Sequence, residues 1–212
     1  MSMARTRLIL IGHSGNAMEI LEHLQDLHEV VAFLDDGAVS ADRMSHGVPV
    51  LPLCRLADFP DAQVLVTFGS VSSLPGRARV VAGLGLAPQR FATVIHPRAH
   101  VSRRAMLGPG TIVFPGAVIT WNAIVGDHCM ILPNSVIHHD VVLEDHVLVG
   151  SNATVAGHCR VGCGSYLGSA CSVKNGVTIG RGSVIGMAAN VLRDCPDGAV
   201  MVGNPARPLV VH

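Results

Sequence analysis

Aromatic side chains are scarce in this sequence. Phe, Trp and Tyr make up 3% of the 212 residues, although 49% of the residues are hydrophobic. The apolar content therefore comes mainly from Val, Ile, Leu and Ala, which suit repeated short strands. This composition argues against a core assembled from a few large rings.

A net charge is also absent. The 15 Lys and Arg residues are cancelled by 15 Asp and Glu residues. Proteins that bind nucleic acid or anionic membranes usually carry a strong positive field on one surface. We therefore expect neither nucleic acid nor a membrane among the partners of this protein.

Two further patterns are missing. Near the start, Arg5 and Arg7 are followed only by the apolar run Leu8–Ile11 before Gly12. That run is too short for a signal peptide or a membrane span. None of the six cysteines has the paired C-x-x-C spacing, which favours free thiols in a reducing compartment. These absences together predict a cytoplasmic protein.

A period of six residues runs through the second half of the chain. Counting in sixes from Ile95 to Val191 meets Ile, Val or Leu at all seventeen positions. The residue four places after each, from Ala99 to Cys195, is always Ala, Ser, Thr, Cys or Val. An α-helix is excluded because its period is about 3.6 residues. The two columns predict a β-solenoid with six residues per face and eighteen per coil.

This solenoid makes a definite prediction about neighbours. Coils stack at about the strand spacing, ~4.8 Å, so each residue should lie beneath the residue eighteen places later. Four cysteines belong to the small inward column and are predicted to be structural: Cys129, Cys159, Cys171 and Cys195.

The first ninety residues follow a different pattern, in which apolar strands alternate with helices. Strands are expected over residues 7–12, 30–36 and 62–70, and helices over residues 16–27 and 75–86. Such alternation is typical of a small parallel α/β domain. We therefore predict an α/β domain over residues 1–94, followed by a solenoid domain over residues 95–212.

Ligands of parallel α/β sheets bind beyond the carboxyl ends of the strands. Two segments lie at such ends, the turn Gly12-His13-Ser14-Gly15 and the pair Asp35-Asp36. The turn lacks the G-x-G-x-x-G spacing of dinucleotide-binding proteins. A plain tight turn, and a plain helix cap at the acids, remain alternatives to ligand binding.

The order of these parts closely resembles one family. A short α/β domain with "GHSG" and "FLDDG", followed by hexapeptide repeats, is similar to the bacterial acyltransferases that N-acetylate nucleotide-linked 4-amino-4,6-dideoxy sugars, with sialic acid O-acetyltransferases as relatives. The resemblance implies an N-terminal Rossmann-like domain, a left-handed parallel β-helix, acetyl-CoA as cosubstrate, and a homotrimer with active sites between subunits. It also implies that the nucleotide binds at Gly12–Gly15 and Asp35-Asp36.

The stretch "SVIHHDVVLEDHV", residues 135–147, combines histidines with acids. The eighteen-residue coil separates them into columns, one of which contains Trp121, His139, Gly157 and Asn175. His139-Asp140 resembles the family's His-acid pair, which implies that His139 is the general base and Asp140 orients it. The resemblance also implies that the Gly157 N–H stabilises the oxyanion. A solvated surface histidine is the alternative.

These roles suit the chemistry of acetyl transfer. The acceptor must lose a proton as its bond to the carbonyl carbon forms, and histidine can take that proton near neutral pH. An adjacent carboxylate fixes the tautomer and stabilises the imidazolium. A backbone N–H can stabilise the negative oxygen of the tetrahedral intermediate.

Further site residues follow from the resemblance and from position. The segment "VGNPA" is similar to the family's C-terminal cap, which implies that Gly203, Asn204, Pro205 and Ala206 help to bind acetyl-CoA; a simple end cap is the alternative. Lys174 is a candidate for the CoA phosphates. His146 is a candidate for substrate binding, against the alternative of a surface histidine.

Other functions stay open at this point. O-acetylation of a sialic acid-type sugar would use the same chemistry. A metal-dependent hydratase resembling the γ-type carbonic anhydrases would bind zinc through histidines across a trimer interface. A non-catalytic scaffold is the remaining alternative. The α/β domain and the tail favour the nucleotide-sugar acetyltransferase, for which we expect no metal.

Overall fold

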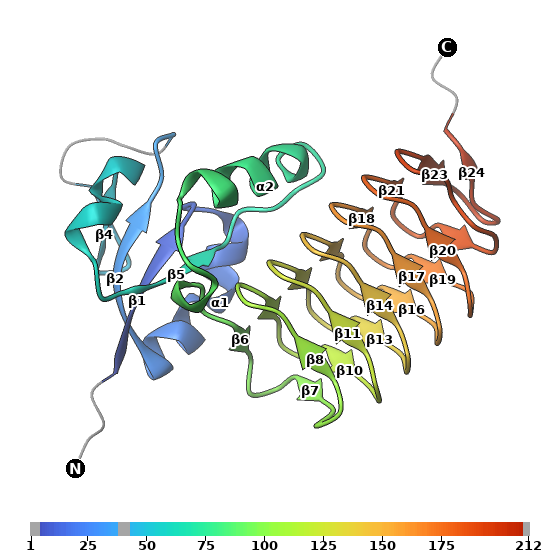
Figure 1. Ribbon diagram of the computed structural model, residues 1–212, viewed down its shortest axis with the longest axis horizontal. Coiled ribbons are helices and arrows are strands. Elements are labelled where there is room, and N and C mark those ends of the chain that lie inside the picture. The colour runs from blue at the N-terminus through green and yellow to red at the C-terminus, as the bar shows by residue number, and fades with distance from the viewer. Residues whose placement is uncertain (1–4, 38–42, 210–212) are drawn as a thin grey trace. The chain divides into compact units, whose positions relative to one another are not determined.

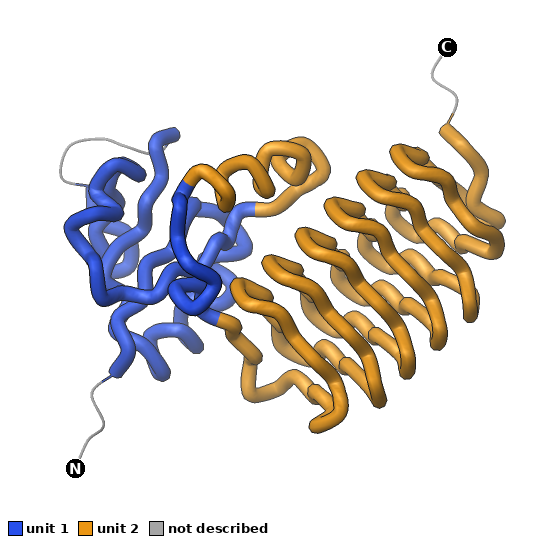
Figure 2. Tube along the Cα trace, in the orientation of Figure 1, with its two compact units in different colours: residues 1–68, 84–92 blue, residues 69–83, 93–212 orange. Residues whose placement is uncertain are grey.

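The computed structural model describes residues 5–37 and 43–209. Contacts divide the chain into two compact units (Figure 2). The first comprises the residues up to 68 together with 84–92, and the second comprises 69–83 together with the residues from 93 onward. The domain boundary after residue 94 stays a prediction. No helix of the described residues is long and apolar enough to cross a membrane.

The first unit contains a five-stranded sheet in the order β3-β4-β2-β1-β5 (Figure 1). All pairings are parallel except that of β3 with β4. Its strands are β1 (Thr6–Ile11), β2 (His28–Leu34), β3 (Met44–Ser45), β4 (Val48–Leu51) and β5 (Gln63–Val66), and its helices are α1 (Gly15–Leu27), η1 (Leu53–Asp58) and η2 (Pro88–Arg90). The predicted strands over residues 7–12, 30–36 and 62–70 correspond to β1, β2 and β5, and the predicted helix over 16–27 corresponds to α1. The helix predicted over 75–86 is part of the second unit instead.

Helix α1 follows β1 directly, and its residues explain this. Its buried side chains, Ala17, Ile20, Leu21 and Leu24, recur at helical spacing and form one apolar stripe. Ser14 is the N-cap, because its hydroxyl oxygen accepts a hydrogen bond from the Ala17 N–H. The cap at Ser14 determines where α1 begins, shortly after the end of β1, and the apolar stripe determines which side of the helix is buried.

The second unit is a coil of very short strands arranged in three parallel faces (Figure 1). The first face contains β7 (His100–Val101), β10 (Val118–Ile119), β13 (Val136–Ile137), β16 (Thr154–Val155), β19 (Ser172–Val173) and β22 (Asn190–Val191). The second contains β8 (Met106–Leu107), β11 (Ile124–Val125), β14 (Val142–Leu143), β17 (Arg160–Val161) and β20 (Thr178–Ile179). The third contains β6 (Val94–Ile95), β9 (Ile112–Val113), β12 (Met130–Ile131), β15 (Leu148–Val149), β18 (Tyr166–Leu167), β21 (Val184–Ile185), β23 (Val200–Val202) and the antiparallel β24 (Arg207–Pro208).

The register confirms the period read from the sequence. Val118 pairs with Val136, and Ile137 pairs with Val155, so residues eighteen apart stack on successive coils. The inward aliphatic column fills the interior, where Ile137 and Val155 are fully buried. The four cysteines of the small column are buried as well, which confirms their structural role: Cys129, Cys159, Cys171 and Cys195. Repeated parallel strands of this kind fit the β-helix of the hexapeptide acyltransferases.

The spacing of eighteen residues between stacked positions does not hold in the last coil. Cys195 bridges Ile179, and Val184 pairs with Val200, so both partners lie sixteen residues apart instead of eighteen. The turn after β22 is two residues shorter than its predecessors. The side chain of Asp194 compensates, because its carboxylate accepts the Thr178 N–H at 2.8 Å. Cys195 therefore stays in the core but has a different partner from the one the column predicts.

Residues 69–83 cover part of the third face within the second unit. This segment includes α2 (Leu74–Gly83), which buries Leu74, Arg77 and Val81. The Arg77 guanidinium, 1% exposed, donates a hydrogen bond to the backbone carbonyl of His128. Burying this charge is tolerated because its donors reach a backbone acceptor on the coil. The apolar outward residues Met130 and Leu148 are consequently buried.

The His128 ring gives the fold a pH dependence. His128 is 7% exposed and stacks on His146, with ring centroids 5.2 Å apart. Burial, then His146 and Arg77, lower its pKa from 6.5 to about 4, whereas Asp145 opposes the shift. Between those values the unfolded chain binds more protons than the folded one. We therefore expect the free energy of unfolding to be highest above pH 6.5 and to fall toward pH 4, by up to about 3 kcal/mol.

Urea unfolding between pH 7 and pH 4 measures this effect. We expect His128→Asn to flatten the dependence, and asparagine suits the left-handed φ of 55° at this position. The matched control is His158→Asn, at an exposed position with a φ of 61°. An equal slope in wild type and His128→Asn would show that His128 is not the titrating group.

Candidate functional site

The candidate site lies at the first corner, the series of turns that joins the first face to the second. Asn122, Asp140 and His158 occupy equivalent turn positions on three successive coils, with φ of 55°, 58° and 61°. Short polar residues tolerate this left-handed conformation better than most others. The backbone bonds connect the coils in register, since the Asp140 N–H donates to the Trp121 carbonyl and the His158 N–H to the His139 carbonyl.

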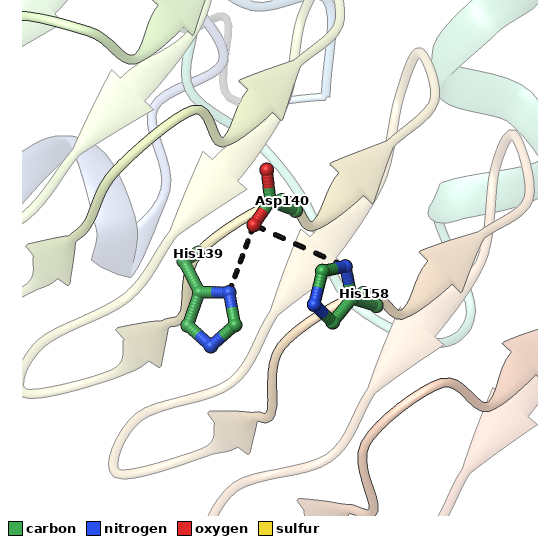
Figure 3. Close-up of side chains that lie close together, drawn as sticks. All are labelled: His139, Asp140 and His158. Carbon is green, nitrogen blue, oxygen red and sulfur yellow. Dashed lines mark hydrogen bonds and ion pairs between the residues drawn. The ribbon is translucent and has the colours of Figure 1, made fainter.

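The His139–Asp140 pair is formed as the sequence predicts (Figure 3). Nδ1 of His139 lies 2.9 Å from Oδ2 of Asp140, and both side chains are accessible to solvent. Asn122, one coil earlier, donates from Nδ2 to the other carboxylate oxygen at 3.3 Å. These hydrogen bonds, from His139 first and then Asn122, lower the pKa of the Asp140 carboxyl. Asp140 is therefore an anion that holds the His139 ring through Nδ1 and leaves Nε2 as the free proton acceptor.

A second histidine, His158, shares the same carboxylate (Figure 3). Its Nδ1 lies 3.9 Å from Oδ2 of Asp140, and its ring meets the His139 ring edge-on with centroids 4.9 Å apart. One ring nitrogen from each histidine and one Asp140 carboxylate oxygen lie within 4.8 Å of one another, close enough to hold a metal ion. The eighteen-residue column places His158 beside Asp140, but nothing in the sequence assigns it a role.

Gly157 lies directly over the His139 ring. A Cβ atom built on Gly157 would lie 2.6 Å from both Cε1 and Nε2 of His139. The ring can therefore occupy its position only because residue 157 has no side chain. Among the described residues, the Gly157 N–H has no hydrogen-bond acceptor.

In the first unit, the glycine turn and the first acid are brought together. The His13 N–H donates to Oδ2 of Asp35 at 2.7 Å, and the Gly37 N–H donates to the other oxygen at 2.9 Å. Gly12 has a φ of 97°, and a Cβ there would lie 3.0 Å from Phe68, so glycine is required.

Two of the other predicted substrate residues already have structural partners. Oδ1 of Asp36 accepts the Leu53 N–H at 2.7 Å. The Ser14 hydroxyl donates to the Thr67 carbonyl at 3.0 Å in addition to capping α1. Gly15 is exposed at the first turn of α1.

His146 is not near His139 along the coil. It lies at the second corner, between the second and third faces, where it stacks on His128. It also lines a cavity of about 290 Å³ with residues of segment 69–83, including Leu74 and Ala78. The structure thus separates it from the His139–Asp140 pair within one chain.

The tail residues cap the last coil. The Asn190 N–H donates to the Gly203 carbonyl at 3.0 Å, and the Ala206 N–H donates to the Asn190 carbonyl at 2.8 Å. Asn204 accepts from the Asn190 side chain at 3.3 Å, and the peptide to Pro205 is cis. The end-cap role is therefore present, and acetyl-CoA binding by this segment stays a prediction.

Lys174, the remaining predicted residue, is exposed on the coil above Gly157. Its backbone carbonyl accepts a hydrogen bond from the Cys159 thiol at 3.0 Å. A contact with the phosphates of CoA stays a prediction.

Comparisons with known proteins agree with this architecture. A family model described as the GMPPB C-terminal domain matches residues 91–195. A perosamine N-acetyltransferase from Caulobacter crescentus, solved as a histidine variant with CoA and GDP-perosamine, is 27% identical with a TM-score of 0.88 over 100% of both chains. PerB from the same organism, also with CoA and GDP-perosamine, is 29% identical with a TM-score of 0.85, covering 99% of this chain and 100% of PerB.

A third solved structure extends the comparison to another genus. The acetyltransferase domain of PglB from Neisseria gonorrhoeae, in complex with acetyl coenzyme A, is 27% identical with a TM-score of 0.84, covering 97% of this chain and 100% of that domain. No curated protein matches the sequence. The similarity to these solved structures includes both units, so the chain is similar over its two units to bacterial 4-amino-sugar N-acetyltransferases of the hexapeptide-repeat class.

Proposed function

We propose that this protein transfers the acetyl group of acetyl-CoA to the 4-amino group of a nucleotide-linked 4-amino-4,6-dideoxy sugar. The observation that carries this proposal is the hydrogen-bonded His139–Asp140 pair, with Gly157 directly above the ring. Relatives solved with CoA and a nucleotide-linked amino sugar support the substrate class.

The geometry suits a direct transfer. The acceptor nitrogen attacks the thioester carbonyl carbon while Nε2 of His139 takes its proton. Asp140 stabilises the resulting imidazolium through Nδ1 at 2.9 Å. The carbonyl oxygen becomes an oxyanion that the free N–H of Gly157 can stabilise. Collapse of the intermediate breaks the C–S bond, and the leaving CoA thiolate receives the proton that His139 took from the amine, so the base is regenerated and no acyl-enzyme is required.

The first unit is proposed to act as a Rossmann-like domain that binds the nucleotide. Its support is the position of the turn Gly12–Gly15 and of Asp35-Asp36 at the carboxyl ends of β1 and β2. The hydrogen bond from the His13 N–H to Asp35 orients the carboxylate beside the turn. Within residues 5–37 and 43–209, Asp36 accepts a hydrogen bond only through Oδ1, from the Leu53 N–H.

The second unit is proposed to be a left-handed β-helix that forms a homotrimer, with acetyl-CoA in a groove between neighbouring subunits. Lys174 is exposed above Gly157 and can meet CoA phosphates. The cap formed by Gly203–Ala206 is proposed to contact the same cosubstrate. His146 is proposed to contact substrate only where another subunit brings it to the second corner.

A thiol-release assay with acetyl-CoA and a panel of nucleotide-linked sugars tests the proposal. We expect CoA release only with acceptors that carry a free 4-amino group, and the product should gain one acetyl group by mass spectrometry. Release with hydroxyl acceptors alone would identify an O-acetyltransferase. No release with any acceptor, together with near-stoichiometric zinc in the purified protein, would contradict acetyl transfer and favour a metal-dependent hydratase.

A further inference from the structure

We propose that the surface immediately below His139 is the subsite for the sugar diphosphate of the acceptor, with Trp121 packing on the sugar and Arg104 binding the diphosphate. "Below" means toward earlier coils. This proposal rests on the acetyltransferase function and adds residues that determine acceptor binding. Its experiment can fail independently of that function.

Trp121 carries the first part of this inference. It lies eighteen residues before His139 and hence one coil below it, and the Asp140 N–H donates to its carbonyl at 3.0 Å. It is the only Trp in the chain and is 54% exposed. An exposed indole presents a flat apolar face on which a ligand can pack, with a polar N–H at its edge. A deoxy sugar offers an apolar ring face and a methyl group that suit an indole.

Arg104 carries the second part. Its guanidinium lies 5.1 Å from the centroid of the Trp121 ring. Arg104, Asn122 and Asp140 are spaced eighteen apart, so Arg104 lies two coils below Asp140, a distance of roughly 10 Å. That distance matches a hexose with its first phosphate. The planar fork of an arginine suits phosphate oxygens well.

A hollow on the second face extends from Arg104 to Asp140, the residue that holds His139. It has a volume of about 350 Å³ and is lined by Arg104, Met106, Asn122, Ile124, Asp140 and Val142. Arg104 lies on the earliest of the three coils that line the hollow. Asp140, which holds the catalytic base, lies on the latest. The apolar side chains between them offer contacts for a sugar, and the cation offers one for its diphosphate.

Acetyl-CoA also contains a diphosphate, so the side of approach decides between the two substrates. Gly157 packs above His139. In the proposed mechanism its N–H is the donor for the thioester oxygen, which places the thioester on the upper side of the base. The amine must attack the carbonyl carbon while its proton faces Nε2 of His139. Trp121 and Arg104 lie on the lower side, where the acceptor is expected.

The single Trp makes binding directly measurable. Tryptophan fluorescence of the full chain is titrated with GDP-mannose, UDP-N-acetylglucosamine, dTDP-glucose and CoA, with N-acetyltryptophanamide correcting for absorbance. We expect a saturable change with at least one nucleotide sugar and none with CoA. A change with CoA alone, or no change with any of the four, would overturn the proposal.

Variants give a second measurement that depends on catalysis. Arg104→Gln and Trp121→Leu are each expected to raise KM for the acceptor roughly 10- to 100-fold. KM for acetyl-CoA and kcat should change less than about twofold. Arg98→Gln, at an exposed position of the same coil, is the matched control. Unchanged acceptor KM in both variants would overturn the subsite, whereas fluorescence binding without acetyl transfer would overturn the proposed function alone.

Discussion

Replacing His139 with alanine is expected to lower kcat roughly 10²–10⁴-fold, which is the usual contribution of a general base. The side chain is exposed, and its polar contact is with Asp140 at the surface. Folding should therefore be unaffected. Steady-state thiol release measures kcat, and thermal unfolding measured by circular dichroism checks the fold.

The neighbouring histidine supplies the control for this experiment. His138 immediately precedes His139 in the sequence. Among the described residues, it makes no hydrogen bond to Asp140. His138→Ala should keep kcat within about threefold of wild type, as expected of a residue outside the proton transfer. A His139→Ala variant with wild-type kcat would remove His139 from the mechanism, and equal losses in both variants would point to a structural cause.

Gly157→Ala is expected to have the second-largest effect, a loss in kcat of roughly 10²-fold. The new Cβ would lie 2.6 Å from Nε2 of His139, so the ring must rotate away. That movement disrupts the 2.9 Å contact with Asp140 and displaces the proton acceptor. The clash involves a solvent-exposed side chain and not the backbone, so the variant should fold normally. Thiol-release kinetics at saturating acetyl-CoA separate the loss in kcat from weaker binding.

The matched control is another glycine that has room for a methyl group. Gly76 in α2 has no atom within 4 Å of a built Cβ. Gly76→Ala should retain wild-type kcat and stabilise the fold slightly, by about 0.4–1 kcal/mol. If Gly157→Ala also kept full activity, the packing of His139 on Gly157 would have no catalytic role.

The coil and its stacking order were predictable because each solenoid repeat contacts only its neighbours. Ile137 and Cys129 point inward as the period of six requires, and His139 lies between Trp121 and Gly157. The prediction failed for the partner of Cys195, since one turn is two residues shorter and no periodic count can anticipate such a deletion. In the first unit, the apolar spacing predicted β1, β2, β5 and α1, whereas the short elements β3, β4, η1 and η2 were not predicted.

Side-chain partners could not be read from the period. The column places His158 next to Asp140, but only the side-chain conformations bring its Nδ1 within 3.9 Å of the carboxylate. The sequence left open whether Asp35 and Asp36 bind a ligand or cap the chain, and in the folded chain both accept backbone N–H groups.

The sequence by itself determined the coil, its register and the order Trp121, His139, Gly157 along one corner, because a strict repeat converts sequence separation into vertical distance. The tertiary structure alone decided which polar atoms meet, and it placed the buried Arg77 against the His128 carbonyl. That contact joins residues 51 positions apart, beyond any repeat. Such pairings depend on how a helix packs on the coil, and that packing requires both elements to be folded.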